Sequence, residues 1–195
     1  METFGRIDVL VNNACTAEIC TFENVIEEQF DKQINVALKA PVFLSQKCFP
    51  ELKKNKGNIV NVSSIAAARP PSLGHAIYSV SKAALNQFTQ CAGIEYGSEG
   101  VRVNVVCPGL VATGFFIKAG IVDTEAEQDE HYKKLTRCTP LKKPGTPEET
   151  AKLIAYLASD DASMMNGANI IHDGGLTLMG LDTKTIENAA KCASE

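Results

Sequence analysis

The sequence predicts an α/β fold built on a doubly wound parallel sheet. Short apolar runs rich in Val and Ile alternate along the chain with longer segments of helical periodicity. This alternation is typical of parallel sheets, whose strands are buried on both faces by the connecting helices. The length of 195 residues fits one domain. We place that domain at residues 1–180 and treat residues 181–195 as a C-terminal tail that forms a short surface helix.

Four strands are expected, and each is short, rich in β-branched residues and bounded by Gly, Pro or Asn. They cover residues 7–13, 58–63, 102–107 and 168–172.

Three long helices are expected between and after these strands. The first covers residues 25–54, and Pro41 should bend or interrupt it because proline has no amide hydrogen to donate. The second runs from residue 75 to residue 98 and should stop at the glycines there. The third begins after Thr146, an N-cap that is followed by a proline and completed by Glu149 as a capping box.

One segment does not follow the alternation. Residues 113–143 are long, mixed in charge and contain Phe115, Phe116, His131 and Tyr132. An insertion of this length after a strand is more often a functional lid than an idle loop. We expect a lid in which the aromatic side chains pack together, and we favour this packing over a chemical role for His131.

Composition and charge exclude several classes of function. The chain has 19 basic and 23 acidic residues, a net charge of −4 and no large basic cluster, so we expect no nucleic-acid partner. We expect no membrane partner, because no apolar run is long enough to span a bilayer, and the N-terminus has no secretory signal pattern. The 7 cysteines include no CxxC pair and the 3 histidines lack ligand spacing, so we expect no metal site. A reducing, cytoplasmic location is the economical prediction for such thiols.

The run Tyr78-Ser79-Val80-Ser81-Lys82 is the strongest chemical signal. Residues four apart on a helix project from the same face, so Tyr78 and Lys82 would lie about one turn apart. This spacing alone is weak, because it occurs by chance in many surface helices.

The strand ends strengthen this signal. Asn12 and Ala14 end the first strand, Ser63 and Ser64 end the second, and residues 107–113 follow the third. The carboxyl ends of parallel strands meet at one edge of the sheet, where open α/β folds bind ligands. The sequence therefore predicts a ligand crevice where these strand ends and the Tyr78 helix face converge.

These motifs, in this order, resemble those of the classical short-chain dehydrogenase/reductase family. The resemblance covers roughly residues 5–180 and rests on NNA at 12–14, INV at 34–36, NVSS at 61–64, YSVSK at 78–82, EGVRVNVVCPG at 99–109 with Thr113, and HDGG at 172–175. It implies a Rossmann-like sheet of which strands four to seven are present.

The resemblance implies an oxidoreductase that uses NAD or NADP to interconvert an alcohol and a ketone. Tyr78 would be the general acid/base, and Lys82 would hold the nicotinamide ribose and lower the pKa of the phenol. An ammonium about 4 Å away would favour the phenolate by at most roughly 4 kcal/mol, or about three pKa units. Ser64 would bind the substrate oxygen, with Ser63 as the alternative. Asn35 would complete a proton relay through water, or else be a buried polar residue at the helix bend.

The resemblance also implies a set of cofactor-binding residues. Asn12 and Ala14 match the adenosine side, where Cys15 replaces the usual glycine, and Val111 and Thr113 match the nicotinamide carboxamide. Thr113 is alternatively a helix cap, and Asn61 is expected to stabilise the central strands. The complete set is Asn12, Ala14, Tyr78, Lys82, Pro108, Gly109, Val111 and Thr113.

A glycine-rich turn for the cofactor pyrophosphate is missing. None of the 14 glycines forms a G-x-G pair, although such turns bring backbone N–H groups to a pyrophosphate. We therefore expect a chain truncated at its N-terminus by two βαβ units, or roughly 60 residues or more. The edge of residues 7–13 would then be uncovered.

Two functions follow as hypotheses. The first is an active oxidoreductase with a small carbonyl or alcohol substrate. The second is a catalytically silent, truncated member that acts through association of its long helices, around residues 34–52 and 76–94. These helices form subunit interfaces in the family, so the resemblance implies a homodimer or homotetramer in either case.

Overall fold

The computed structural model describes residues 3–137 and 139–179 and contains a four-stranded parallel sheet in the order β1-β2-β3-β4. All four predicted strands are confirmed. Their bounds are Val9–Asn12 for β1, Asn58–Val62 for β2, Arg102–Pro108 for β3 and Asn169–His172 for β4. Because all four run in the same direction, their carboxyl ends meet at one edge of the sheet.

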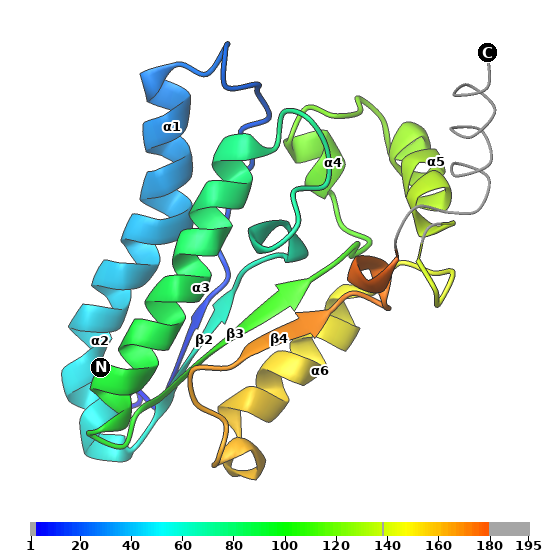
Figure 1. Ribbon diagram of the computed structural model, residues 1–195. Coiled ribbons are helices and arrows are strands. Elements are labelled where there is room, and N and C mark those ends of the chain that lie inside the picture. Colours follow the sequence, from blue (N-terminus) through cyan, green and yellow to red (C-terminus); the bar gives the residue numbers. More distant parts are fainter. Residues whose placement is uncertain (1–2, 138, 180–195) are drawn as a thin grey trace, which may run out of the picture.

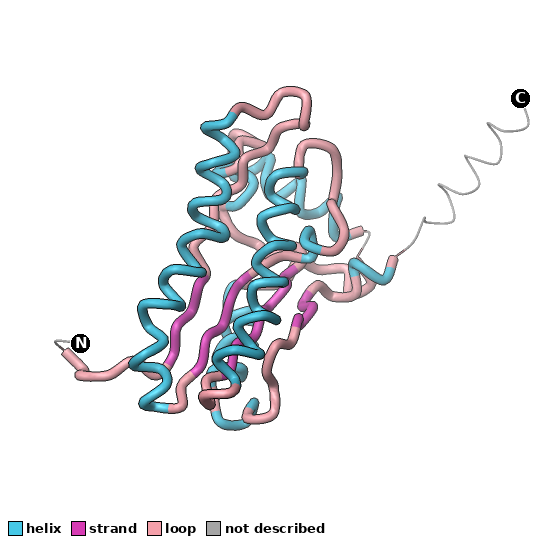
Figure 2. The backbone as a smooth tube through the Cα atoms, turned by 60° about the vertical axis from the view of Figure 1, so that its left-hand side comes forward, coloured by secondary structure: helices cyan, strands magenta, loops and turns pink. Residues whose placement is uncertain are grey.

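Helices cover both faces of the sheet (Figures 1 and 2). On one face α2 (Ala40–Asn55) and α3 (Ala76–Gly97) pack on the strands, and α6 (Pro147–Ala158) covers the other face. Neighbouring strand residues point to opposite faces, so Ile59 packs toward α2 and α3 while Val60 packs toward α6. Both side chains are fully buried, which explains why β2 is apolar without alternation.

The first long helix is interrupted near Pro41, as predicted. It consists of α1 (Glu27–Ile34), a π-helical turn over Asn35–Lys39, and α2. In the π turn the Ala40 amide bonds to the carbonyl of Asn35, five residues earlier. Pro41 follows in the first turn of α2, where its missing amide hydrogen breaks the ordinary four-residue pattern.

The other two predicted helices are confirmed. The second is α3, which ends at Gly97. The third is α6, whose N-cap Thr146 accepts a hydrogen bond from the Glu149 amide at 3.2 Å. The Glu149 carboxylate accepts the Thr146 amide at 2.9 Å in return, which completes the predicted capping box.

The segment expected to be a lid carries two helices, α4 (Phe115–Lys118) and α5 (Glu125–Thr136). They lie beyond the carboxyl end of β3 (Figure 1). The predicted aromatic packing is present: the Phe116 ring lies 4.6 Å from His131 and 4.9 Å from Tyr132, measured between ring centres. The tail helix expected over residues 181–195 lies outside the described residues.

One edge of the sheet is formed by β1. Its Val9 and Val11 side chains are 37% and 42% exposed, whereas Asn12 is buried. The other edge is β4, where Ile171 is exposed. Both edge strands of the sheet therefore carry exposed apolar side chains.

Candidate active site

Two strand ends and one helix meet at the predicted edge of the sheet. Ser63 and Ser64 directly follow β2, and Cys107 lies at the end of β3. The thiol of Cys107 is hydrogen-bonded with the Asn86 side chain, and burial raises its pKa. Tyr78 and Lys82 reach this place from α3 and are only 8% and 2% exposed. The structure thus brings these residues together.

Among the residues that the structure describes, the buried Lys82 side chain has no carboxylate partner. Its Nζ donates a hydrogen bond to the Val62 carbonyl at 2.8 Å, and it lies 5.9 Å from the centre of the Tyr78 ring. Within the described part of the chain this carbonyl is its one hydrogen-bond acceptor. An ammonium carries three donors, so two remain for a ligand oxygen.

Tyr78 is a neutral phenol in this structure. Burial raises its pKa well above the ordinary value, a negative charge on Cys15 would act in the same direction, and a side-chain hydrogen bond with Ser64 works against both. The expectation that Lys82 lowers this pKa is wrong here. The ammonium is directed at the Val62 carbonyl, so the cost of burying a phenolate dominates.

The two serines after β2 have different surroundings. Ser64 is hydrogen-bonded to the Tyr78 side chain, and its hydroxyl also accepts the Ala66 amide at 3.1 Å. Ser63 is buried and donates to the Lys82 carbonyl at 3.1 Å. Ser64 therefore lies beside the phenol, while Ser63 braces α3 against β2.

Asn12 takes part in a buried amide network rather than lying open to solvent. Its Nδ2 donates to Asn61 Oδ1 at 2.8 Å, and Asn61 Nδ2 donates to Thr89 Oγ1 at 2.9 Å. The network links β1, β2 and α3, which is the stabilising role expected of Asn61. The bond to Asn61 engages the side-chain amide of Asn12, which restricts how that amide could contact a cofactor.

Asn35 lies on the π turn, and its side chain is exposed there, so the alternative of a buried polar residue at the helix bend is wrong. Its role in a proton relay through water stays a prediction. The buried positions of this segment recur every four residues, at Gln33, Ala37, Pro41 and Ser45.

Gln33 is a buried residue of the site region that the sequence interpretation missed. Its Oε1 accepts the Glu18 amide at 3.0 Å and its Nε2 donates to Ser81 Oγ at 3.0 Å. Ser81 Oγ donates in turn to the Tyr78 carbonyl at 2.7 Å. Gln33 therefore connects the loop after β1 with the helical turn of Tyr78. Its place in the four-residue repeat that continues through Ala37 and Pro41 was the signal that would have identified it.

Gly109 makes a close backbone approach after β3 and Pro108. Its amide donates to the His172 carbonyl at 3.0 Å, and a Cβ on Gly109 would lie 2.7 Å from Asp173 Cβ. Burial opposes ionisation of Asp173, yet amide hydrogen bonds from Thr177 and Gly175 lower its pKa overall. The HDGG motif at residues 172–175 thus contacts the backbone of Gly109, which leads into the predicted cofactor loop.

The remaining predicted cofactor positions lie on loops. Ala14 is exposed, and Val111 is half-buried. Tyr132 of α5 donates its hydroxyl to the Val111 carbonyl at 2.6 Å and accepts the Thr113 amide at 3.2 Å. The Thr113 hydroxyl accepts the Phe115 amide at 3.3 Å, although the N-cap residue of α4 is Gly114 rather than Thr113.

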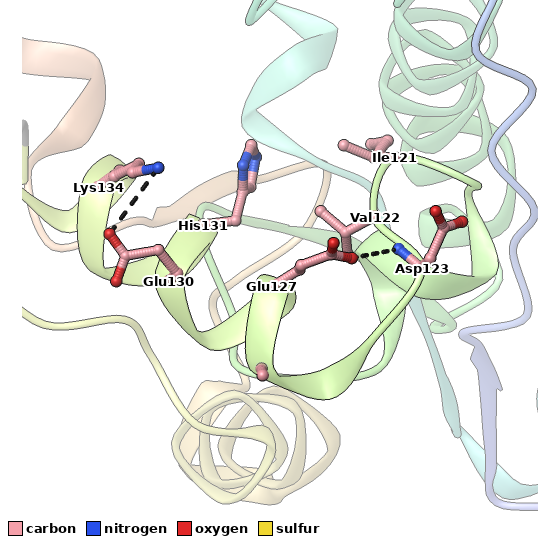
Figure 3. A pocket seen from close by; sticks show the side chains of 8 residues that line it. Ile121, Val122, Asp123, Glu127, Glu130, His131 and Lys134 are labelled. Atoms are coloured by element: carbon pink, nitrogen blue, oxygen red, sulfur yellow. Dashed lines mark hydrogen bonds and ion pairs between the residues drawn. The ribbon is translucent and has the colours of Figure 1, made fainter.

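Two hollows in the surface do not coincide with Tyr78. The first measures about 530 Å³ and lies between α5 and the preceding connection (Figure 3); its walls are Ile121, Val122, Asp123, Ala126, Glu127, Glu130, His131 and Lys134. A second, of about 380 Å³, includes Asn58 and Arg102 at the amino ends of β2 and β3. We therefore locate the candidate site by the positions of Ser64, Tyr78 and Lys82 rather than by a hollow. The partly buried Phe115, whose ring centre lies 6.0 Å from that of Tyr78, forms the apolar wall of this site.

Residues 3–137 and 139–179 contain no cluster of three His, Cys, Asp or Glu side chains suited to a metal ion. Nor does any helix within these ranges have the length and apolar character needed to cross a membrane. All five cysteines in them are free.

Comparisons with known proteins agree with this geometry. A family model described as enoyl-(acyl carrier protein) reductase matches residues 1–177. An uncharacterized oxidoreductase of Thermotoga maritima is 40% identical over 181 residues, which cover 91% of this chain and 70% of the relative. Meso-2,3-butanediol dehydrogenase of Serratia marcescens is 38% identical, with 90% of this chain and 66% of the relative covered.

A solved structure is also similar. It is a short-chain dehydrogenase/reductase of unknown function from Caenorhabditis elegans, determined with cofactor. The TM-score is 0.86 at 35% identity, and the match covers 94% of this chain and 70% of that one. The resemblance therefore extends from individual motifs to the arrangement of the whole described fold.

Proposed function

Since this chain belongs to the short-chain dehydrogenase/reductase family of oxidoreductases, we propose that it interconverts an alcohol and a ketone by hydride transfer with NAD(H) or NADP(H). The observation that carries the proposal is the convergence of Ser64, Tyr78 and Lys82 at the carboxyl edge of the sheet. The name of the Serratia relative, a butanediol dehydrogenase, supports alcohol and ketone chemistry.

The residues present fit the nicotinamide end of such a coenzyme. Lys82 retains two ammonium donors, which suit the paired hydroxyls of a ribose. Gly109 has no side chain, which allows its backbone to lie close to Asp173. Val111 and Thr113 follow it in the chain. Ala14 is exposed at the end of β1. A bound nicotinamide coenzyme supplies the hydride acceptor or donor. We propose these residues, with Tyr78, Pro108 and Asn12, as the cofactor-binding set.

The protein's own groups would manage the proton and the developing charge. In the reductive direction the neutral Tyr78 phenol donates its proton to the carbonyl oxygen as that oxygen becomes an alkoxide. The Ser64 hydroxyl donates a second hydrogen bond to the same oxygen. In the oxidative direction Tyr78 must first lose its proton to act as the base, and burial of the phenol opposes this loss. A positioned acid or base of this kind typically contributes about 10² to 10⁴ in rate.

A direct assay tests the proposal. The purified 195-residue chain would be mixed with NADH or NADPH and with acetoin, a cyclic ketone and an aryl methyl ketone, while coenzyme oxidation is followed. We expect saturable coenzyme binding and turnover of at least one ketone that is lost in Tyr78→Phe. Absence of binding and of turnover with every pair would contradict the proposal and leave the silent, associating protein as the better hypothesis.

The surface of the long helices favours self-association under either hypothesis. Phe43 and Leu44 on α2 and Val80 and Ile94 on α3 are 47% to 78% exposed. The exposure of these apolar side chains on two helices that pack together is consistent with a subunit interface. We propose a homodimer or homotetramer formed through α2 and α3, to be measured by light scattering on a sizing column. A strictly monomeric protein would contradict this assembly.

A further inference from the structure

We propose that Tyr132 is a positioning residue that holds the cofactor loop, residues 110–113, to the lid helix α5. The inference rests on the proposed function, because it concerns how the nicotinamide end of the site is held. It assigns a role to a lid residue that does not belong to the proposed catalytic or cofactor-binding set.

The first observation is the hydrogen bonding of the Tyr132 hydroxyl. Tyr132 is 6% exposed, and its hydroxyl donates to the Val111 carbonyl at 2.6 Å while accepting the Thr113 amide at 3.2 Å. A phenol has one donor and can accept as well, so one group satisfies both backbone positions. Two backbone groups that do not belong to a regular strand or helix are thereby paired by a single side chain.

The second observation is that the opposite side of the loop is held by different means. Gly145 donates its amide to the Leu110 carbonyl at 2.8 Å and accepts the Ala112 amide at 2.9 Å. These bonds fix residues 110 and 112, whereas Tyr132 bonds to residues 111 and 113. The loop is therefore held on one side by Gly145, in the connection before α6, and on the other side by Tyr132 of α5. The bonds to Gly145 join backbone groups, whereas the bonds to Tyr132 use its side chain.

The third observation is the aromatic packing that fixes Tyr132 itself. Its ring lies 4.9 Å from Phe116, Phe116 lies 5.7 Å from Phe115, and Phe115 lies 6.0 Å from Tyr78. This series of ring contacts runs from α5 through α4 to the proposed acid/base. A displacement of α5 would therefore change both the loop that meets the nicotinamide and the wall beside Tyr78.

Tyr132→Phe removes the hydroxyl while keeping the ring against Phe116. The matched control is Tyr156→Phe, because Tyr156 is 45% exposed on α6 and its hydroxyl reaches only the Asp161 carbonyl, at 3.5 Å. Amide hydrogen exchange, followed by mass spectrometry, would be measured on peptides containing Thr113. Coenzyme affinity would be measured from the fluorescence of NADH and NADPH titrated with each full-length protein.

In the wild type the Thr113 amide should exchange slowly although its side chain is exposed. In Tyr132→Phe its exchange should quicken about fivefold or more, the equivalent of one net hydrogen bond. The dissociation constant of the coenzyme should rise by about the same factor, with kcat changed less than KM. Tyr156→Phe should leave both readouts at wild-type values.

Unchanged Thr113 exchange in Tyr132→Phe would overturn the inference. Faster exchange with unchanged coenzyme affinity would also overturn it, because the hydroxyl would then be only a structural tie. A wild-type chain that binds neither coenzyme would overturn the proposed function instead. In that case Thr113 exchange still decides whether Tyr132 holds the loop.

Discussion

The Lys82 ammonium lies 5.9 Å from the centre of the Tyr78 ring and donates to the Val62 carbonyl. The two residues share a helix face, yet the hydrogen bond of the ammonium goes to this carbonyl and not to the phenol oxygen. Burial therefore determines the protonation of Tyr78 and raises its pKa. The proposed acid is held in its proton-donating form, which suits reduction of a ketone more than oxidation of an alcohol.

The first prediction concerns pH. A raised pKa keeps the phenol protonated below the ordinary tyrosine value of about 10, so kcat/KM for ketone reduction should be constant between about pH 6 and pH 9. Alcohol oxidation needs the phenolate and should become faster throughout this range. Initial rates in both directions across this range provide the measurement. Reduction that declines near neutral pH would show that the phenol titrates there, contrary to this structure.

The second prediction concerns the acid/base itself. Tyr78→Phe should lower turnover by about 10² or more, because the variant lacks the phenol that donates the proton. Tyr96→Phe is the control on the same helix, since its ring stacks on Phe49 at the far end of α3. Steady-state rates and thermal unfolding of both variants are the measurements. Equal rates for the two would remove Tyr78 from the mechanism.

The third prediction separates the two serines. Ser64→Ala should reduce kcat by about 10² to 10³, because a hydrogen-bond donor to the developing alkoxide is lost. Ser63→Ala should leave kcat nearly unchanged and lower the free energy of unfolding by about 1 kcal/mol, because its hydroxyl braces the Lys82 carbonyl. Kinetics and urea unfolding of both variants would check this. The opposite pattern would support Ser63 as the substrate-binding residue.

Much of the fold was predictable because local signals agree with the tertiary structure. Thr146 and Glu149 form the capping box that their spacing indicates, and the apolar strands are buried on both faces. The strand-to-helix alternation set the topology. The two lid helices were not predicted, because α4 has four residues and α5 is mostly polar, so neither has strong helical periodicity.

The candidate site was predicted less completely. Tyr78, Lys82 and Ser64 converge because their elements are regular, so spacing alone places them. The alternative of a buried Asn35 was wrong because the π turn shifts the helical register, and a motif match cannot detect that shift. The pKa of Tyr78 depends on burial and on the direction of one flexible ammonium, neither of which is encoded in a four-residue spacing.

The fourth prediction tests the helical register at the π turn, which buries Gln33 and exposes Asn35. Gln33→Leu removes a fully buried amide and leaves the Glu18 amide and Ser81 without their partner, so unfolding should become easier by about 1–3 kcal/mol. Asn35→Ala changes an exposed side chain and should alter stability by less than about 0.5 kcal/mol, with turnover unaffected. Denaturant unfolding and steady-state kinetics provide the comparison. A large loss of turnover in Asn35→Ala would support the predicted role of Asn35 in a proton relay.

The last prediction concerns Gly109. An alanine Cβ there would lie 2.7 Å from Asp173 Cβ and 2.8 Å from Asp173 Cα, too close for any carbon pair. The loop cannot simply retreat, because the Gly109 amide is bonded to the His172 carbonyl at 3.0 Å. Overpacking of this kind costs about 1–3 kcal/mol, so Gly109→Ala should unfold at lower denaturant concentration.

Gly114 offers the matched control for Gly109, because it lies on the same connection with φ near −73° and a Cβ there would meet only Lys118 Cε, at 3.8 Å. Gly114→Ala should cost at most a few tenths of a kcal/mol as a changed helix cap. Coenzyme affinity should fall in Gly109→Ala alone, because the displaced segment leads directly into residues 110–113. Equal stability and equal coenzyme affinity in the two variants would show that Asp173 yields and that the close approach does not hold the loop.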